Sequence, residues 1–294
     1  MKIGFSFLII ALLSAVAVPV LAQSPPTLRI ETETPGLPSE LFYGNIKVKP
    51  VRLRPGTNTP ITITDIDFFV QQQYIDFLGR MPDSTGFANW VATLTACPDG
   101  GFGENLNPGC DRVHVSAGFY LSTEFQGRGY WAYRYYDAAL GRRATYKEFI
   151  PDMQKVGGAL SPQQEAVAKD QYMNDFVQKA EFKAIYDGRS NQGYLDKLEQ
   201  TAGVTISNKA TLVAALNGGT QTRAQVLRTF IESQPVFDKF FNRGFVTMQY
   251  FGYLRRDPDP IGFKNWVDTL NADPSNFRHM IFGFIYSTEY LTRF

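Results

Sequence analysis

Histidine and the common catalytic motifs are nearly absent from this chain of 294 residues. Its only histidines are His114 and His279, and it contains no GxSxG, HExxH or glycine-rich phosphate loop. Nucleophilic triads and the other motif-based mechanisms need such residues at fixed spacings. An enzyme of this sequence would therefore have to work through carboxylates alone.

An excess of charge is lacking as well. Removal of the N-terminal segment that holds Lys2 leaves 28 basic and 28 acidic residues, so the net charge is zero with histidine neutral. Nucleic-acid-binding domains carry a strongly basic surface that attracts phosphates. The sequence therefore predicts no nucleic-acid partner.

Long apolar runs are confined to the N-terminus. Residues 1–22 contain Lys2, an apolar run from Phe5 to Val20, and Ala22 in a small-x-small pattern before Gln23. This pattern predicts a secretory signal peptide, with an uncleaved anchor as the alternative. No later stretch approaches the roughly 18 apolar residues of a spanning helix. We therefore expect an exported chain (periplasmic, cell-surface or extracellular) with no membrane-spanning segment after cleavage.

Cysteine is scarce, and both copies lie in one short stretch, CPDGGFGENLNPGC, as Cys97 and Cys110. An even count in an exported chain predicts a disulfide between them. Closing so short a loop stabilises the fold by about 3 kcal/mol on the chain-entropy model. A metal site is the alternative, but no pair of histidines lies nearby.

Residues 23–65 are rich in proline and threonine and show no helical period. Ile46, Val48, Val51 and Leu53 alternate with basic residues, which is typical of short strands. Pro50 weakens the case for a central strand. This segment is predicted to be an extended linker or a small β stub.

One stretch occurs twice, as FVQQQYIDFLGRMPDSTGFANWVATL (69–94) and FVTMQYFGYLRRDPDPIGFKNWVDTL (245–270), with 15 of 26 positions identical. In both copies the apolar residues recur at i, i+3, i+4 and i+7, the period of an α-helix. Pro82 and Asp83 interrupt the first copy, because proline ends one helix and aspartate caps the next. Each copy is therefore predicted to form a helix, a capped turn and a second helix.

Weaker copies lie between the two clear ones. Leu140-Gly141-Arg142 matches Leu78-Gly79-Arg80, and TRAQVLRTFIESQPVF (222–237) keeps the spacing of the later helix. We therefore predict an all-α helical-repeat domain at 66–294 with four related units, at about 69–125, 131–182, 186–237 and 245–294. The first copy carries extra residues that include both cysteines.

The stretches FVQQQYIDFLGRMPDSTG, FANWVATL and FYLSTEF, with TRAQVL and NRGFVTMQYFGYLRRDPD, resemble the bacterial domain of unknown function 4214 family. That family is similar to the helical domain of phycobilisome linkers, and its members occur in secreted and cell-surface proteins. The resemblance covers roughly 66–294. It implies an envelope location and an association role, with no catalytic residues to carry over, and the loss of the Pro-Asp turn in the middle units puts a site shared by all copies in doubt.

Three groups of residues are candidate sites. Asp257, Asp259 and Gly262 match three positions of a calcium loop, with a Pro-Asp helix cap as the alternative. Glu124 and Glu289 recur in Ser-Thr-Glu-Phe/Tyr, and paired carboxylates can hydrolyse glycosides, although a repeated buried hydrogen bond explains them better. No other metal or cofactor is predicted.

The third group is the aromatic cluster at 130–136. Trp131 and Tyr135 share a helix face, and Tyr136 aligns with the core residue Tyr74, so Tyr130 and Tyr133 are left to point outward. Exposed aromatic rings stack on sugars or on proteins; plain core packing is the alternative.

The predicted function is an exported, non-enzymatic binding or structural module that associates with a cell-envelope protein or polysaccharide. The alternatives are a secreted carbohydrate-active enzyme that uses acidic residues, and a sugar-binding module without catalysis.

Overall fold

The computed structural model describes residues 28–31, 40–47, 52–54, 56–102, 107–157 and 161–294. The predicted signal peptide, residues 1–22, lies outside the described residues. The chain divides into two compact units, Met1–Thr59 and Pro60–Phe294, of which the second is helical. Each unit is described by itself.

The described part of the first unit contains short strands: β1 (Leu28–Glu31), β2 (Glu40–Tyr43), β3 (Ile46–Lys47) and β4 (Arg52–Leu53). The first three form an antiparallel sheet in the order β1-β2-β3, in which Leu28 is opposite Tyr43 and Phe42 is opposite Lys47. Short strands thus occur in the described part of the Pro/Thr-rich segment. Val48 and Val51 lie outside the described residues.

The second unit begins with β5 (Pro60–Ile61) and is otherwise built from helices, which confirms the all-α prediction. In order the helices are α1 (Ile66–Gln73), η1 (Tyr74–Leu78), α2 (Ser84–Thr95), η2 (Pro98–Gly101), α3 (Arg112–Leu121), α4 (Thr123–Gly127), α5 (Gly129–Tyr135), η3 (Tyr136–Leu140), α6 (Tyr146–Val156), α7 (Pro162–Phe176), α8 (Ala180–Tyr186), α9 (Asn191–Ala202), α10 (Lys209–Asn217), α11 (Arg223–Ile231), α12 (Gln234–Gln249), η4 (Tyr250–Leu254), α13 (Pro260–Ala272), η5 (Pro274–Asn276), α14 (Phe277–Ile285) and α15 (Thr288–Leu291). Within the described residues, none of the helices combines the length and the apolar content required to cross a membrane.

One local structure occurs three times in the described residues. An α-helix widens into a single π-helical turn, namely η1, η3 and η4, and the next residue adopts a left-handed conformation. That residue is Gly79 (φ 64°), Gly141 (φ 70°) or Arg255 (φ 51°). A π turn inserts one residue into the helix and is frequent at functional sites. In residues 186–237, which are all described, no π turn occurs.

Capping residues start the helix that follows each π turn, and also helix α9. Asp83 and Asp259 accept hydrogen bonds from the backbone N–H of Gly86 and Gly262, both at 2.7 Å. Thr145 and Ser190 cap α6 and α9 in the same way. The side-chain oxygen satisfies an amide that has no partner inside the helix, so the predicted helix, capped turn and helix are present in both clear copies.

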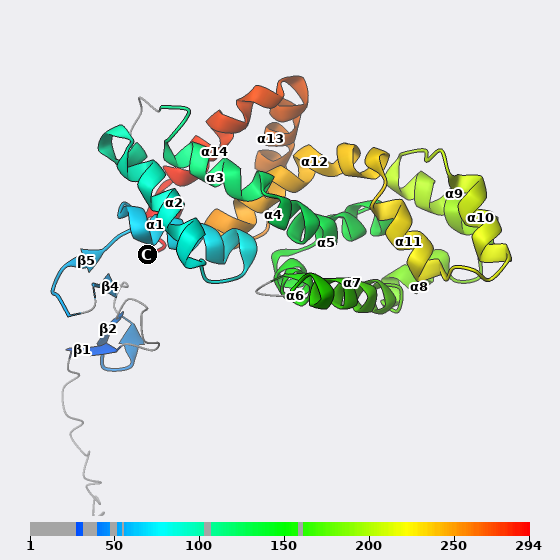
Figure 1. The fold of residues 1–294 in the computed structure, drawn as a ribbon, viewed down its shortest axis with the longest axis horizontal. Helices are drawn as coiled ribbons and strands as arrows, with labels where there is room; N and C mark the ends of the chain where they lie inside the picture. Colours follow the sequence, from blue (N-terminus) through cyan, green and yellow to red (C-terminus); the bar gives the residue numbers. More distant parts are fainter. Residues whose placement is uncertain (1–27, 32–39, 48–51, 55, 103–106, 158–160) are drawn as a thin grey trace, which may run out of the picture. The chain divides into compact units, whose positions relative to one another are not determined.

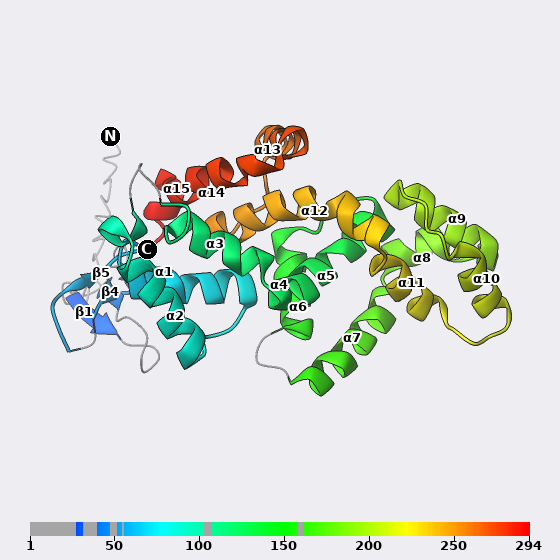
Figure 2. The same cartoon turned by 45° about the horizontal axis from the view of Figure 1, so that its top comes forward.

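The core of the helical unit is formed around α12, which lies beside α5 and runs into η4 (Figures 1 and 2). Tyr120 of α3 stacks on Phe245 of α12 with ring centroids 4.3 Å apart. α5 also contacts the end of α11, where the Trp131 Nε1–H donates to Glu232 at 2.8 Å. Segments more than a hundred residues apart in sequence therefore share one apolar interior.

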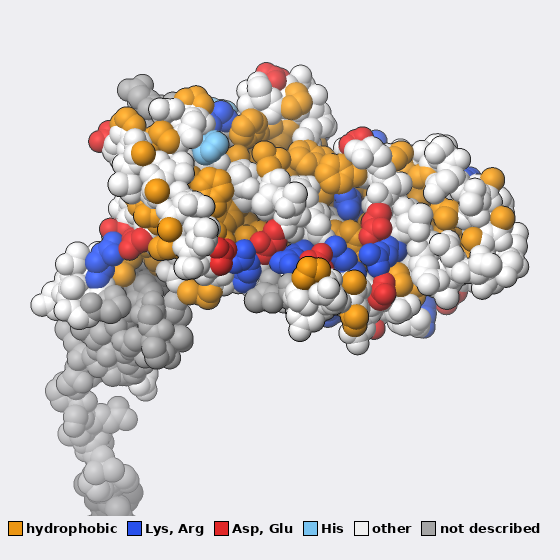
Figure 3. Space-filling model, in the orientation of Figure 1, with side chains coloured by type: hydrophobic (Ala, Val, Ile, Leu, Met, Phe, Trp, Pro, Cys, Tyr) orange, Lys and Arg blue, Asp and Glu red, His pale blue; other side chains and the backbone are white. Residues whose placement is uncertain are grey.

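Acidic and basic side chains alternate across one face of the helical unit (Figure 3). Arg128 donates to Glu124 at 2.7 Å and to Glu165 at 2.9 Å, and Lys169 pairs with Glu165 at 2.7 Å. These pairs connect the short helix α4 to the long helix α7. Because they are only partly exposed, they orient the two helices more firmly than fully solvated pairs do.

Candidate functional site

Each π turn belongs to a cluster of a tyrosine, an arginine and a glutamate. In the first cluster Arg80 donates to both carboxylate oxygens of Glu124, at 2.7 and 2.8 Å, and its guanidinium lies 5.0 Å from the ring centroid of Tyr74. The equivalent clusters are Tyr136, Arg142 and Glu181, and Tyr250, Arg256 and Glu289. Such two-bonded pairs are strong and geometrically specific. They hold α4, α8 and α15 against the turns.

These clusters account for the repeated glutamates. Glu124 and Glu289 each lie in their own cluster, so the structure does not show them acting on one bond. Arg256 lowers the pKa of Glu289, whereas a general acid for glycosides needs a carboxyl that stays protonated. Both glutamates therefore form ion pairs that stabilise the fold.

Tyr130 and Tyr133 are both buried, so the prediction that they point outward is wrong. The Tyr130 hydroxyl donates to the carbonyl of Phe237 at 2.5 Å, and the Tyr133 hydroxyl is 3.1 Å from that of Thr247. Burial raises the pKa of both phenols. The physical reason is that α12 covers the side of α5 that the helical period left exposed, so these rings belong to the core.

The calcium candidates both bind backbone amides. Asp259 caps α13, and Asp257 accepts a hydrogen bond from the backbone N–H of Tyr146 at 2.7 Å. Among the described residues no group of three or more His, Cys, Asp or Glu could hold a metal ion. The helix-cap alternative therefore describes the observed role of Asp259.

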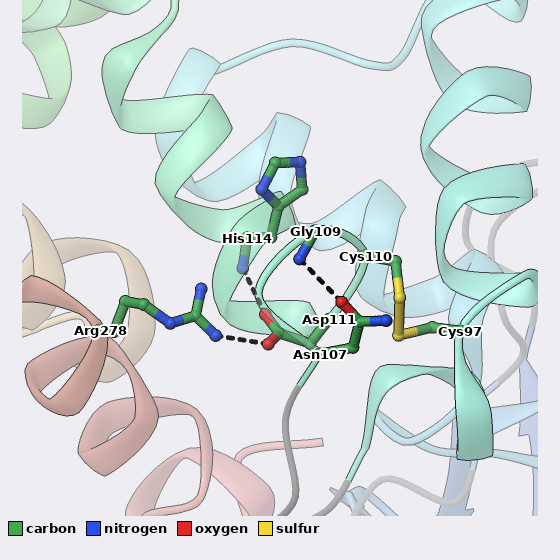
Figure 4. Close-up of a disulfide and its surroundings, with 7 residues drawn as sticks. All are labelled: Cys97, Asn107, Gly109, Cys110, Asp111, His114 and Arg278. Carbon is green, nitrogen blue, oxygen red and sulfur yellow. Dashed lines mark hydrogen bonds and ion pairs between the residues drawn. A yellow bond between two sulfur atoms is a disulfide. The ribbon is translucent and has the colours of Figure 1, made fainter.

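The predicted disulfide is present, between Cys97 and Cys110 (Figure 4). The adjacent Asp111 caps α3 by accepting from the His114 N–H at 2.7 Å, and it also pairs with Arg278 of α14. The disulfide therefore joins Cys97, which precedes η2, to Cys110, which precedes α3, and the ion pair of Asp111 joins the start of α3 to α14.

A cleft of about 490 Å³ opens where η1, α6 and η4 meet. Roughly 300–1,000 Å³ is typical of pockets for small ligands. Its lining is mostly apolar, with a few charged groups: Ile75, Asp76, Gly79, Arg80, Met81, Tyr146, Ile150, Met153, Gln154, Phe251 and Arg255. The side chain of Met81 is exposed at its rim. An apolar lining with a few charged groups is the composition of a ligand pocket.

The carboxylate of Asp76, in the cleft lining, is bound by two arginines. Asp76, whose side chain is only 4% exposed, accepts from Arg255 at 2.9 Å and from Arg293 at 2.5 Å. Arg293 also donates to the carbonyls of Gly252 and Tyr253 at 2.7 and 2.8 Å. The Arg255 side chain is 45% exposed and donates through Nη2 alone, so its Nε and Nη1 have no partner among the described residues. The cleft therefore has cationic donors in excess.

Arg255 also has an unfavourable backbone. It adopts φ 51° at the position where the other two π turns have glycine. A side chain in this left-handed region costs about 1 kcal/mol. The chain keeps an arginine there, and that arginine reaches Asp76 of η1, more than 170 residues earlier.

Sequence reasoning did not single out Asp76, Arg255 or Arg293. One signal was visible, because the two clear copies read Leu78-Gly79-Arg80 and Leu254-Arg255-Arg256. A large cation that replaces glycine immediately after a helix indicates a site where a side chain is needed despite the backbone cost. Its partner Asp76 cannot be found from either copy alone.

Residues 237–294 match the model of a family described as Domain of unknown function (DUF4214). This match covers the last of the predicted units and confirms the resemblance there. The chain matches no curated protein and no solved structure.

Proposed function

We propose that this protein is an exported, non-catalytic module that binds a component of the cell envelope, protein or polysaccharide, through the cleft between η1, α6 and η4. The observation that carries the proposal is the cleft itself, an apolar cavity with unpaired donors of Arg255 at its edge. Binding pockets characteristically combine an apolar lining with a few such polar groups.

Two further observations support the proposal. The Cys97–Cys110 disulfide is compatible with export, because disulfides persist in oxidising compartments. The recurring glutamates are held by arginines, which leaves them poorly suited to acid/base catalysis. Together these features favour binding over turnover.

The test is retention of the purified protein on separate fractions of peptidoglycan, surface polysaccharide and solubilised surface proteins, with released reducing sugar measured in the same tubes. We expect retention on one fraction and no released sugar. Released sugar that disappears in Glu124→Gln would instead establish the carbohydrate-active enzyme.

A matched pair of variants locates the binding site. Ile150→Trp places an indole in the cleft and should abolish retention. Val167→Trp places the same side chain on an exposed position of α7 outside the cleft lining and should leave retention unchanged. Equal retention of both variants would remove the cleft from the proposal.

A further inference from the structure

We infer that the group of the envelope component that enters the cleft has an apolar body and a single anionic end, and that Arg255 recognises this anionic end. This inference deepens the proposed function and depends on the same site. It specifies the chemical class of the ligand, which the proposed function leaves open.

The charged residues of the cleft lining favour a ligand with a negative charge. Its charged lining residues are Asp76, Arg80 and Arg255, and the carboxylate already accepts from two guanidinium groups. Arg80 is bound by Glu124 through two hydrogen bonds. Arg255 is therefore the lining cation with unused donors, and hydrogen bonds from a charged donor to a carboxylate are stronger than neutral ones.

The apolar lining selects the rest of the ligand. Ile75, Ile150 and Phe251 come from η1, α6 and η4, so three separate elements supply the walls. Tyr146 packs edge-on against Phe251 with ring centroids 5.5 Å apart, which fixes one side of the cavity. Removing an alkyl or aromatic body from water against such walls favours binding in proportion to the apolar area that is buried.

The backbone of Arg255 supplies an independent argument. Glycine at this position would relieve the left-handed strain, as Gly79 and Gly141 do at theirs. Without Arg255, Asp76 keeps its ion pair with Arg293, which binds Oδ2 and is itself anchored by two carbonyls, and it loses only the hydrogen bond to Oδ1. Strained residues are concentrated at ligand sites. The hydrogen bond to Asp76 uses Nη2 alone, so an anionic ligand on Nε and Nη1 would account for keeping the strained arginine.

The test uses three probes that share an eight-carbon chain: octanoate, 1-octanol and octylammonium. We expect titration calorimetry of the purified chain to give a Kd for octanoate about tenfold below that for octanol. Octylammonium should not bind. Equal affinity for octanoate and octanol would overturn the inference.

Three variants connect the preference to the residue. Arg255→Gly removes the guanidinium and should abolish the preference for octanoate while leaving octanol binding unchanged. Lys183→Ala makes the same change in net charge at an exposed position of α8 outside the cleft lining and should behave as wild type. Ile150→Trp should lose all three probes. An unchanged preference in Arg255→Gly would overturn the assignment.

The outcomes separate this inference from the proposed function. Retention on an envelope fraction without selective octanoate binding would refute the ligand class and leave the binding module standing. Loss of retention in Ile150→Trp together with selective octanoate binding would support both.

Discussion

The buried carboxylate of Asp76 forms ion pairs with two arginines. Its two oxygens are divided between an arginine that is largely buried, Arg293, and one that is half exposed, Arg255. The pair with Arg293 is the one the fold depends on, because the same guanidinium also serves two backbone carbonyls of η4. The pair with Arg255 is screened by water and is expected to contribute little.

Substitution of the two arginines should therefore have unequal effects. Arg293→Ala leaves Asp76 partly uncompensated and two carbonyls without a donor, so we expect the free energy of unfolding to fall by about 3 kcal/mol. Arg255→Gly loses a weak pair and relieves backbone strain, so the change should stay within about 1 kcal/mol. Urea denaturation measures both, and equal losses would contradict this division of roles.

Glu148 links the folded state to pH. Its hydrogen bonds with Arg142 lower the pKa of the carboxyl from 4.5 to about 2, and it also accepts from the Thr145 N–H in a capping box. Because the folded-state pKa is the lower one, its contribution to stability is complete above pH 4.5 and is lost as pH falls toward 2. Solvent exposure of the pair reduces the size of the effect.

The substitution Glu148→Gln tests this assignment, because glutamine keeps the capping box while it removes the charge. We expect the variant to be less stable than wild type at neutral pH and the difference to shrink as pH falls from 4.5 toward 2. Thermal unfolding across that range measures it. Asp175→Asn, at an exposed carboxylate with no ion pair among the described residues, is the control and should show no such convergence.

The third residue of the capped helix is glycine at Gly86, Gly262 and Gly193, but only the first two positions lack room for a side chain. A methyl group added at Gly262 would collide with the Tyr250 hydroxyl, and one added at Gly86 would collide with that of Tyr74. At Gly193, in the same position of α9, the nearest atom is the Ser190 Oγ at 3.3 Å and no tyrosine is close. In these two copies the tyrosine hydroxyl beside the cap, rather than the helix itself, therefore determines the glycine. In the second copy Tyr136 donates to Asp152 instead, and Glu148 occupies this position.

Alanine at the two positions should change stability in opposite directions. Gly193→Ala removes glycine from a helix and should raise the free energy of unfolding by up to about 1 kcal/mol. Gly262→Ala displaces Tyr250 from Asp259 and should lower it by about 1–2 kcal/mol. Chemical denaturation of both variants makes the comparison, and stabilisation by Gly262→Ala would refute the role of Tyr250.

These elements also show how far sequence reasoning extends. The period of apolar residues and the Pro-Asp caps predicted the helices around Asp83 and Asp259, because both signals are local. The period assumes one buried face per helix, and it failed at Tyr130 and Tyr133 because α12 covers a second face of α5. The cleft was not predicted, since Asp76 and Arg255 meet only through the packing of η1 on η4.

Contacts between distant segments make the helical unit a single body. The buried Asp137 of η3 accepts from Arg243 of α12 at 2.8 Å, and Tyr253 of η4 is hydrogen-bonded to Gln73 of α1 at 3.2 Å. Each contact joins residues more than a hundred positions apart. The last predicted unit is thus held to the first, and α12, which leads into it, is held to the second. This arrangement is unlike a linear array in which each repeat contacts only its neighbours.

We therefore expect residues 60–294 to unfold in one cooperative transition, with equal calorimetric and van't Hoff enthalpies. Asp137→Asn should lower the midpoint without splitting the transition, because α12 keeps its apolar contacts with α5 after the ion pair is lost. Asp268→Asn, which removes an exposed pair with Lys264, is the control and should leave the midpoint unchanged. Two resolved transitions, or a stable proteolytic fragment for each predicted unit, would show that the copies fold as separate domains and that the cleft between η1, α6 and η4 is not a fixed site.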